Sequence, residues 1–326
     1  MGSLKEGLDS QGLSDRREPQ ICRMGILRYV VGMSHRRAPQ PPPELMLLLV
    51  PLLWGWGYPL IRGSLDAIGP LGFLFWRFLA ALVPLGAMYG HRLGEAGPTT
   101  WRRGIVTGVS LFLAYAFLNW GLVFTTTAKA GFIIGLRVIL VPIVGALLFR
   151  LRVAGPSWVA ASVSMVGLVF IFFGDFSPPL RFNPGDGLMV ASALFFALHI
   201  LLVGRYGRRE TFAALLVLQV ATVALLSGLG AALVERALLP DDPAVWRDAA
   251  LAGVFATGLA FWLQNRFQPR ATADRTGVIF SSEPVFAAAF GFLYLGETLQ
   301  GWQWAGAGLI IAAMLLARFA VSVPRE

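Results

Sequence analysis

The stretch RTGVIFSSEPVFAAAFGFLYLGETLQGWQW, residues 275–304, decides how the rest of the chain is interpreted. Its middle is apolar enough to lie in hydrocarbon, yet it holds the ionisable Glu283 followed directly by Pro284. A charged side chain near the centre of a membrane helix costs a few kcal/mol, and it usually faces a bundle interior or a cavity. Proline removes a backbone donor and kinks the helix. The pair therefore predicts a membrane helix with an interior role.

An earlier stretch, KAGFIIGLRVILVPIVGALLFRLRVAGPSW (residues 129–158), aligns with this one without a gap. The registered matches include Lys129 with Arg275, Gly131 with Gly277, Gly155 with Gly301, and Trp158 with Trp304. Under this alignment Arg137 occupies the position of Glu283. We therefore predict two five-span halves, 44–174 and 187–320. Because five is odd, the second half would enter the membrane from the opposite side, as in the inverted repeats of secondary transporters.

The composition agrees with a membrane protein, because the 326 residues are 56% hydrophobic and only 14% charged. Soluble domains average roughly 25% charged residues. Apolar runs long enough to cross a bilayer recur along the chain. We predict an all-α integral membrane protein with ten transmembrane helices. The expected spans are 44–61, 70–90, 104–123, 131–149, 157–174, 187–204, 212–233, 249–265, 277–295 and 302–320.

Most of the 27 Lys and Arg residues fall on one side of these ten spans. The positive-inside rule then places both termini in the cytoplasm. The net charge of +9 is explained by this loop asymmetry, and it gives no reason to expect nucleic acid as a partner. Acidic residues of the other side, including Asp186 and Glu235, are expected in solvated loops.

Residues 1–43 form a mostly polar tail without the apolar core of a signal peptide, and we expect this tail to be disordered. Met24 and Met33 are alternative start sites. The single cysteine, Cys22, excludes a disulfide framework or a cysteine-based metal site within one chain. No cofactor or metal is predicted.

Four segments, spread over nearly all of 44–320, carry a resemblance to a known family. They are LLWGWGYPLIRGSL (52–65), FLFWRFLAALVPL (73–85), NWGLVFTTTAKAGFIIGL (119–136) and LAFWLQNRFQPRATADRTGVIFSSEPVFAAAFGFLYLGETL (259–299). The sequence resembles the drug/metabolite transporter superfamily, specifically its ten-span EamA-type permeases. The resemblance implies a carrier or exporter of amino acids, metabolites or drugs, with a central cavity between two halves.

The chain departs from the family pattern at three places. FRLRV (149–153) replaces the expected Leu-Gly-Glu at the end of the fourth span, Arg137 replaces a small or polar residue, and His199 replaces an aromatic one. These departures bear on the substrate more than on the fold.

The charged candidates for substrate binding or coupling are Arg77, Arg137 and Glu283, all inside predicted spans. Glu283 is interpreted as a proton-titratable or substrate-contacting carboxylate, or alternatively as the structural partner of one of the two arginines. If both arginines face inward, the excess positive charge favours an anionic or zwitterionic substrate. Alternatively, Arg77 extends outward to the membrane interface.

Five uncharged or neutral candidates complete the predicted site, namely Trp54, Tyr58, Asn119, His199 and Gln264. The two aromatic residues would stack on a substrate, or pack in the core. The two amides would line the cavity, or cap helices. The histidine would relay protons, or form a structural hydrogen bond. Pro142 and Pro284 mark helix breaks near the site, or packing kinks.

The sequence favours a transporter over other classes of membrane protein. We expect an exporter of a small organic metabolite such as an amino acid, working by alternating access with proton coupling as an option. The alternative is a lipid or lipid-carrier flippase. An intramembrane enzyme is disfavoured because no HExxH motif exists and the histidines are scattered. A channel is disfavoured because no ring of charges is present.

The expected partners are a small-molecule substrate and the lipid bilayer, and a homodimer is left open. The high content of Ala, Gly and Arg is typical of a GC-rich bacterium. We therefore expect a multi-pass protein of the bacterial plasma membrane.

Overall fold

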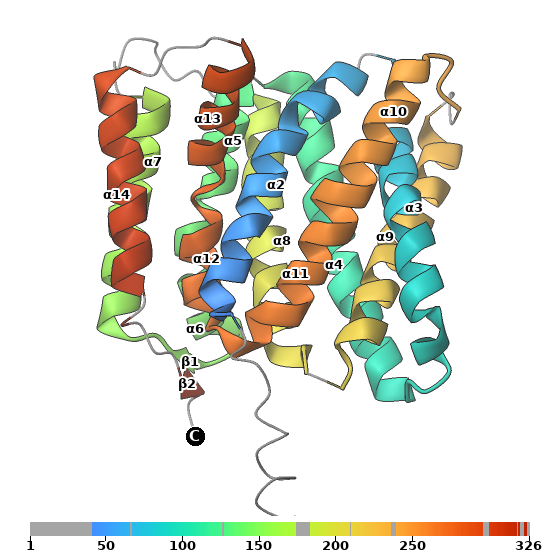
Figure 1. Ribbon diagram of the computed structural model, residues 1–326, viewed down its shortest axis with the longest axis horizontal. Coiled ribbons are helices and arrows are strands. Elements are labelled where there is room, and N and C mark those ends of the chain that lie inside the picture. The colour runs from blue at the N-terminus through green and yellow to red at the C-terminus, as the bar shows by residue number, and fades with distance from the viewer. Residues whose placement is uncertain are drawn as a thin grey trace, which may run out of the picture. The chain divides into compact units, whose positions relative to one another are not determined.

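The computed structural model describes residues 41–65, 67–125, 127–173, 183–208, 210–235, 239–295, 300–317, 319 and 323–324 (Figure 1). The predicted disorder of the tail falls almost wholly outside these residues. The elements are α2 (Pro43–Ser64), α3 (Pro70–Tyr89), η1 (Gly90–Leu93), α4 (Pro98–Phe124), α5 (Thr127–Gly135), α6 (Arg137–Leu148), β1 (Leu151–Arg152), α7 (Gly155–Phe173), α8 (Pro184–Tyr206), α9 (Phe212–Val234), α10 (Pro243–Leu251), η2 (Ala252–Leu259), α11 (Ala260–Phe267), η3 (Gln268–Arg270), α12 (Ala273–Phe280), α13 (Glu283–Leu295), α14 (Gly301–Ala317) and β2 (Val323–Pro324).

The chain is helical because an apolar segment in a bilayer must pair its own backbone groups. Proline opens several of these helices, and at the first position its missing N–H costs nothing; the examples are α2, α3, α4, α8 and α10. The strands β1 and β2 pair antiparallel over two residues each. That short pairing was not predicted.

Seven helical segments of the described residues are long and apolar enough to cross a membrane. They are Pro70–Leu93, Pro98–Phe124, Ala130–Leu148, Gly155–Phe172, Pro184–Tyr206, Phe212–Val234 and Pro243–Arg270. Two shorter apolar helices cover Pro43–Gly57 and Gly301–Ala317. The prediction of a multi-pass, all-α membrane protein is confirmed. The length and composition of the helices do not by themselves confirm ten spans.

Large apolar side chains also cover the outside of the bundle. Leu233 is 86% exposed, and Leu147, Leu225 and Leu293 are exposed in the same way. A water-soluble protein rarely leaves so many large apolar groups uncovered. These side chains form the lipid-facing surface.

Three helical segments depart from a regular α-helix. A turn at Leu136 separates α5 from α6, and Ser281 and Ser282 separate α12 from α13. The third, α10 to α11, stays continuous but winds as a π-helix over η2. π-Helical turns are rare in proteins, and where they occur they often lie at functional sites. In Figure 1 the segments α5–α6 and α12–α13 run in opposite directions through the bundle.

The helices pack in a few close pairs. The helix α4 lies against α8 and α9, α3 against α9 and η2, α2 against α11 and α13, α6 against α8 and α12, and α7 against α14. Glycine permits the closest crossings. A Cβ atom at Gly55 of α2 would lie 2.9 Å from the backbone nitrogen of Ala287 and 3.1 Å from the carbonyl oxygen of Glu283. This glycine therefore holds α2 directly against the first turns of α13.

Two acidic residues expected in solvated loops instead cap helices. Asp186 is buried, accepts a hydrogen bond from the Thr125 hydroxyl at 2.7 Å, and completes a capping box with Asn183. Glu235 accepts hydrogen bonds from the backbone nitrogens of Leu71 and Gly72 at 2.8 and 2.7 Å. The expectation for these two was wrong, because unpaired N–H groups at helix starts attract carboxylates.

Candidate substrate site

A small cavity lies in the middle of the bundle, among α2, α3, α4, α5, α6, α8 and α13. Its lining residues are Trp54, Gly57, Ile61, Arg77, Tyr115, Leu118, Ile134, Arg137, Phe196 and Glu283. Its volume is about 20 Å³, enough for about one water molecule. Four of the predicted site residues, from four parts of the sequence, therefore meet at one place.

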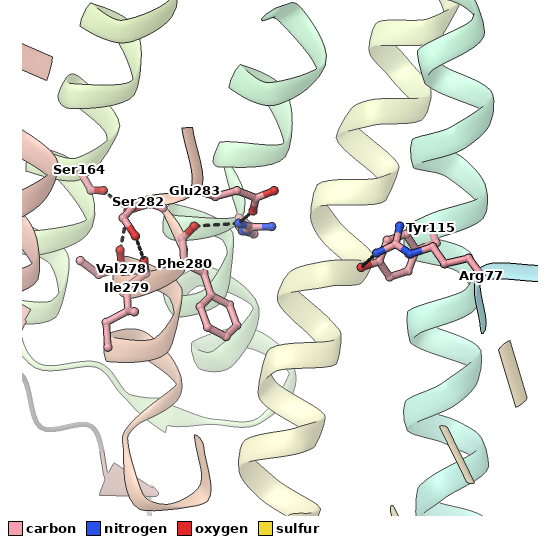
Figure 2. A network of polar contacts seen from close by, with 10 residues as sticks. Arg77, Tyr115, Ser164, Val278, Ile279, Phe280, Ser282 and Glu283 are labelled. Carbon is pink, nitrogen blue, oxygen red and sulfur yellow. Dashed lines mark hydrogen bonds and ion pairs between the residues drawn. The ribbon is translucent and has the colours of Figure 1, made fainter. Parts of the chain in front are cut away.

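Glu283, which is labelled in Figure 2, forms an ion pair with Arg137 on the cavity wall. Nη2 of Arg137 donates to Oε2 of Glu283 and also to the carbonyl oxygen of Phe280, at 2.9 Å for the latter. Both side chains are buried, with 3% of Arg137 and 5% of Glu283 exposed. The carboxylate begins α13 and the carbonyl ends α12. Arg137 thus joins the two sides of the interruption from a different helix.

Aromatic rings enclose the same guanidinium group. The Cζ atom of Arg137 lies 5.4 Å from the ring centroid of Trp54 and 5.9 Å from that of Phe196. Trp54 packs edge-on against Phe261 and Phe280. Cation–π contacts of this kind stabilise a desolvated charge by about 2 kcal/mol.

At the interruption, serine hydroxyls add hydrogen bonds to carbonyl groups that also accept from the backbone nitrogens of Ser281 and Ser282. Ser281 donates to the carbonyl oxygen of Val278 at 2.6 Å, and Ser282 donates to that of Ile279 at 2.7 Å. The hydroxyl of Ser164 in α7 lies 2.5 Å from that of Ser281. These neutral hydrogen bonds stabilise the break between α12 and α13. Figure 2 shows this group beside Glu283.

Arg77 also lines the cavity, and its hydrogen-bond acceptors among the described residues are neutral oxygen atoms. Its Nε donates to the Thr257 hydroxyl at 2.7 Å, and its Nη2 lies 3.4 Å from the carbonyl oxygen of Ala256 and 3.5 Å from the Tyr115 hydroxyl. The guanidinium carbon lies 4.9 Å from the ring centroid of Tyr115. The side chain is 2% exposed. The alternative of an outward-reaching Arg77 is therefore excluded.

The π-helical segment η2 supplies both of the oxygen atoms that lie nearest to Arg77. The Thr257 hydroxyl also donates to the carbonyl oxygen of Ala252 at 3.1 Å, five residues back along the wide turn. A Cβ at Gly253 would lie 2.5 Å from the carbonyl oxygen of Arg77. The absence of a side chain there brings η2 into contact with α3 at the level of Arg77.

Three buried donors on the cavity wall find no acceptor among the described residues. They are Nε1 of Trp54, Nη1 of Arg77 and Nε of Arg137. Most buried polar groups in proteins are hydrogen-bonded, so unpaired donors gathered at one place indicate a site for a ligand or water. The cavity wall is therefore poor in acceptors and rich in donors.

The remaining predicted residues lie elsewhere. Asn119 donates to the carbonyl oxygen of Pro70 at 3.0 Å. Nε2 of His199 lies 2.9 Å from Oε1 of Gln219, and Gln264 donates to Gln268 at 2.8 Å. Asn119, His199 and Gln264 do not line the cavity. The contact of His199 fits its structural alternative, whereas the contacts of Asn119 and Gln264 are neither cavity lining nor helix caps.

The other predictions concern Tyr58 and the two prolines. Tyr58 belongs to α2, but its side chain lies outside the described residues. Pro284 is the second residue of α13 and directly follows the interruption. Pro142 lies inside α6, beyond the turn at Leu136.

Tyr115 is the polar cavity residue that the sequence analysis missed. It contacts Arg77 and the rings of Phe78, Phe196 and Phe261. A signal was available, because Tyr115 is the single tyrosine of the predicted span 104–123. Tyrosine is common in apolar cores, however, and its spacing did not distinguish it from packing residues.

Comparison with known proteins identifies the family. The profile of the EamA-like transporter family matches residues 42–173 and again residues 183–319. The chain belongs to the EamA-like transporter family. Its membership of the drug/metabolite transporter superfamily, predicted from the sequence, is thereby confirmed. This EamA protein is a multi-pass membrane transporter.

Two relatives from Archaeoglobus fulgidus are each described as an "uncharacterized transporter". One is 32% identical, covering 85% of this EamA chain and 86% of the relative. The other is 25% identical over 83% of this chain and 97% of its own length. A crystallised protein with 20% identity superimposes with a TM-score of 0.71, over 84% of this chain and 96% of its own. The last similarity supports the fold alone.

Proposed function

We propose that this EamA transporter exports a small organic metabolite, such as an amino acid or a related compound, by alternating access. The observation that carries the proposal is the central cavity, where Arg77, Arg137 and Glu283 converge from three separate segments. Ionisable groups at this depth are costly and characterise substrate and ion pathways. We place the site residues at this cavity, with Trp54 and Tyr115 beside them.

The helix contacts support two inverted five-span halves. Let α2–α7 be the first half and α8–α14 the second, so that α2 corresponds to α8, α4 to α11 and α6 to α13. Exchanging corresponding helices then turns the contact between α2 and α11 into the contact between α8 and α4, which is also present. It likewise converts α2 with α13 into α8 with α6, and α3 with η2 into α9 with α4. The pairs α3–α9 and α7–α14 are exchanged with themselves. Such a pattern is expected of a pseudo-twofold axis in the membrane plane.

This arrangement accounts for ten spans if α2, α12–α13 and α14 cross the membrane beside the seven long segments. The predicted basic loops would then place both termini in the cytoplasm of a bacterial cell. Alternating access would occur by rocking of one half against the other around the cavity.

The ion pair is the proposed coupling element. Arg137 comes from the first half and Glu283 from the second, so their contact holds the halves together on the cavity wall. Protonation of the carboxylate, or binding of a substrate to either partner, would weaken that contact. Each event would therefore favour a different arrangement of the halves.

The lipid-flippase alternative has less support. A lipid would bring its acyl chains beside the three charged side chains of this cavity. Burying an acyl chain beside such groups would be unfavourable. The experiment below nevertheless includes lipid movement as a separate measurement.

The test uses full-length protein in liposomes, preloaded with amino acids and related organic acids, with internal pH followed by a trapped dye. Wild type is compared with Glu283→Gln and with a control, Glu95→Gln, whose carboxylate forms an exposed contact with Arg92. We expect the wild type and the control to move a solute together with protons. We expect Glu283→Gln to lose the proton movement.

Two results would argue against the proposal. Movement of a fluorescent phospholipid without movement of any solute would favour the flippase. Unchanged solute and proton movement in Glu283→Gln would leave Glu283 as a structural partner of Arg137 only. Export as the direction would be rejected if solute accumulated only in right-side-out vesicles.

A further inference from the structure

Arg77 is a buried cation that forms no ion pair with a carboxylate among the described residues. No Asp or Glu of the described segments forms an ion pair with it, and its hydrogen-bond acceptors are the neutral oxygens of Thr257, Ala256 and Tyr115. Two of these contacts, at 3.4 and 3.5 Å, are long. Its Nη1 atom has no acceptor at all within the described residues.

The second arginine of the cavity differs in this respect. Arg137 is paired with Glu283, so that pair contributes no net charge to the wall. The lining therefore carries two cations and one carboxylate, and the uncompensated charge is that of Arg77. A buried charge without a partner is strongly unfavourable in a medium of low polarity. Such a residue is expected to obtain its counter-charge from a ligand.

We propose that the substrate of this transporter carries a carboxylate group and that Arg77 binds this group in the central cavity. The inference rests on the proposed function and names the substrate class at the same site. A guanidinium group offers parallel N–H donors that match the two oxygens of a carboxylate. The Tyr115 hydroxyl, beside Arg77, and the unpaired Nε1 of Trp54 provide further donors on the same wall.

The geometry also assigns a role to the π-helical segment. Thr257 holds Nε of Arg77 from the side of η2, Nη1 has no acceptor among the described residues and Nη2 makes only long contacts, so the Nη1–Nη2 edge is the one available to a carboxylate. The cavity, at about 20 Å³, is smaller than a carboxylate with its attached carbon chain. Carboxylate binding therefore requires the helices to separate, and it favours a wider state of the transporter.

The test measures thermal unfolding of the full-length protein in lipid nanodiscs at constant sodium chloride concentration. The probes are glycine, alanine, leucine, pyruvate and propionate, each compared with its primary amide. The amide has nearly the same shape but lacks the negative charge. We expect at least one carboxylate to raise the unfolding temperature of the wild type, and its amide to have no such effect.

Variants then assign the effect to Arg77. Arg77→Gln should weaken carboxylate binding roughly ten- to hundredfold, since it removes a charged hydrogen-bond partner. Arg77→Lys keeps the positive charge but lacks the paired N–H donors of the guanidinium group, so it should give an intermediate loss of carboxylate affinity. This variant also tests the proposal if Arg77→Gln does not fold. The matched control is Arg103→Gln, because Arg103 lies 5.2 Å from the ring of Tyr206 but outside the cavity lining.

Each outcome has a defined meaning. The proposal is overturned if amides stabilise the wild type as well as carboxylates do, if no carboxylate in the panel binds, or if Arg77→Gln retains the preference. Its failure is distinguishable from failure of the transport function. If the liposomes move only an uncharged solute, the carboxylate proposal fails and the transport function stands. If carboxylates bind in an Arg77-dependent way but are not transported, the carboxylate proposal stands and the transport function fails.

Discussion

Removing one partner of the Arg137–Glu283 pair should destabilise the folded protein strongly. Arg137 and Glu283 are 3% and 5% exposed, so the energy range for buried ion pairs applies rather than that for surface pairs. Leaving a buried charge unpaired costs about 3–5 kcal/mol. In Glu283→Gln the guanidinium keeps its bond to Phe280 and its contacts with Trp54 and Phe196. We therefore expect the lower end, about 3 kcal/mol.

The double variant Arg137→Gln/Glu283→Gln should be more stable than the sum of the single changes predicts. Neither of the two positions then carries an unpaired charge, and two amides can still form a hydrogen bond. We expect each single variant to lose about 3 kcal/mol and the double variant to recover about 2 kcal/mol of the combined loss. The carboxylate left in Arg137→Gln is partly stabilised by its place at the start of α13.

The assay is reversible unfolding in mixed micelles with increasing dodecyl sulfate, followed by far-ultraviolet circular dichroism. The free energies of the four proteins give the coupling between the two residues. If the stability losses of the two single variants sum to the loss of the double variant within about 0.5 kcal/mol, the reasoning is refuted, because residues that do not interact give additive losses.

Further predictions concern positions away from this pair. Gly55→Ala should lower the free energy of unfolding by about 1–3 kcal/mol, because its Cβ would lie 2.9 Å from a backbone nitrogen of α13. The control Gly86→Ala, with open space around the new Cβ, should be neutral or stabilising. Equal losses of stability in the two variants would contradict the close contact of α2 with α13. Glu235→Gln should cost about 1 kcal/mol in thermal unfolding, because it weakens the cap on α3; an unchanged melting curve would show that this cap is dispensable. Thr257→Val should reduce carboxylate affinity while leaving the bound stoichiometry unchanged in calorimetry, and full affinity would argue against its role in fixing the arginine.

The pairing of Arg137 with Glu283 was partly predictable from the sequence. The gap-free alignment placed both residues at the same position of corresponding segments, and the cost of a buried charge required a partner. Arg77 remained an equal alternative, because an alignment does not fix the direction in which a side chain leaves its helix. The structure shows the direction, and it separates the paired arginine from the unpaired one.

The polar residues outside the cavity show the limit of sequence patterns. Asn119, His199 and Gln264 each needed a hydrogen-bond partner, but the sequence could not distinguish a neighbouring carbonyl or amide from a substrate. The π-helix was equally hidden. In a segment that is apolar on all sides, as η2 is, the spacing of apolar residues is the same for an α-helix and a π-helix.

The first residue of α6 is Arg137 and the first of α13 is Glu283, at matching positions of two segments that align without a gap. Side chains that meet across a twofold axis are copies of each other whenever the two parts are identical. Two arginines or two glutamates would then face one another and repel. The attraction seen here exists because the two aligned positions carry opposite charges. A symmetric assembly of two copies of either segment alone would therefore place like charges at this contact. The ion pair forms only between two segments of unlike sequence.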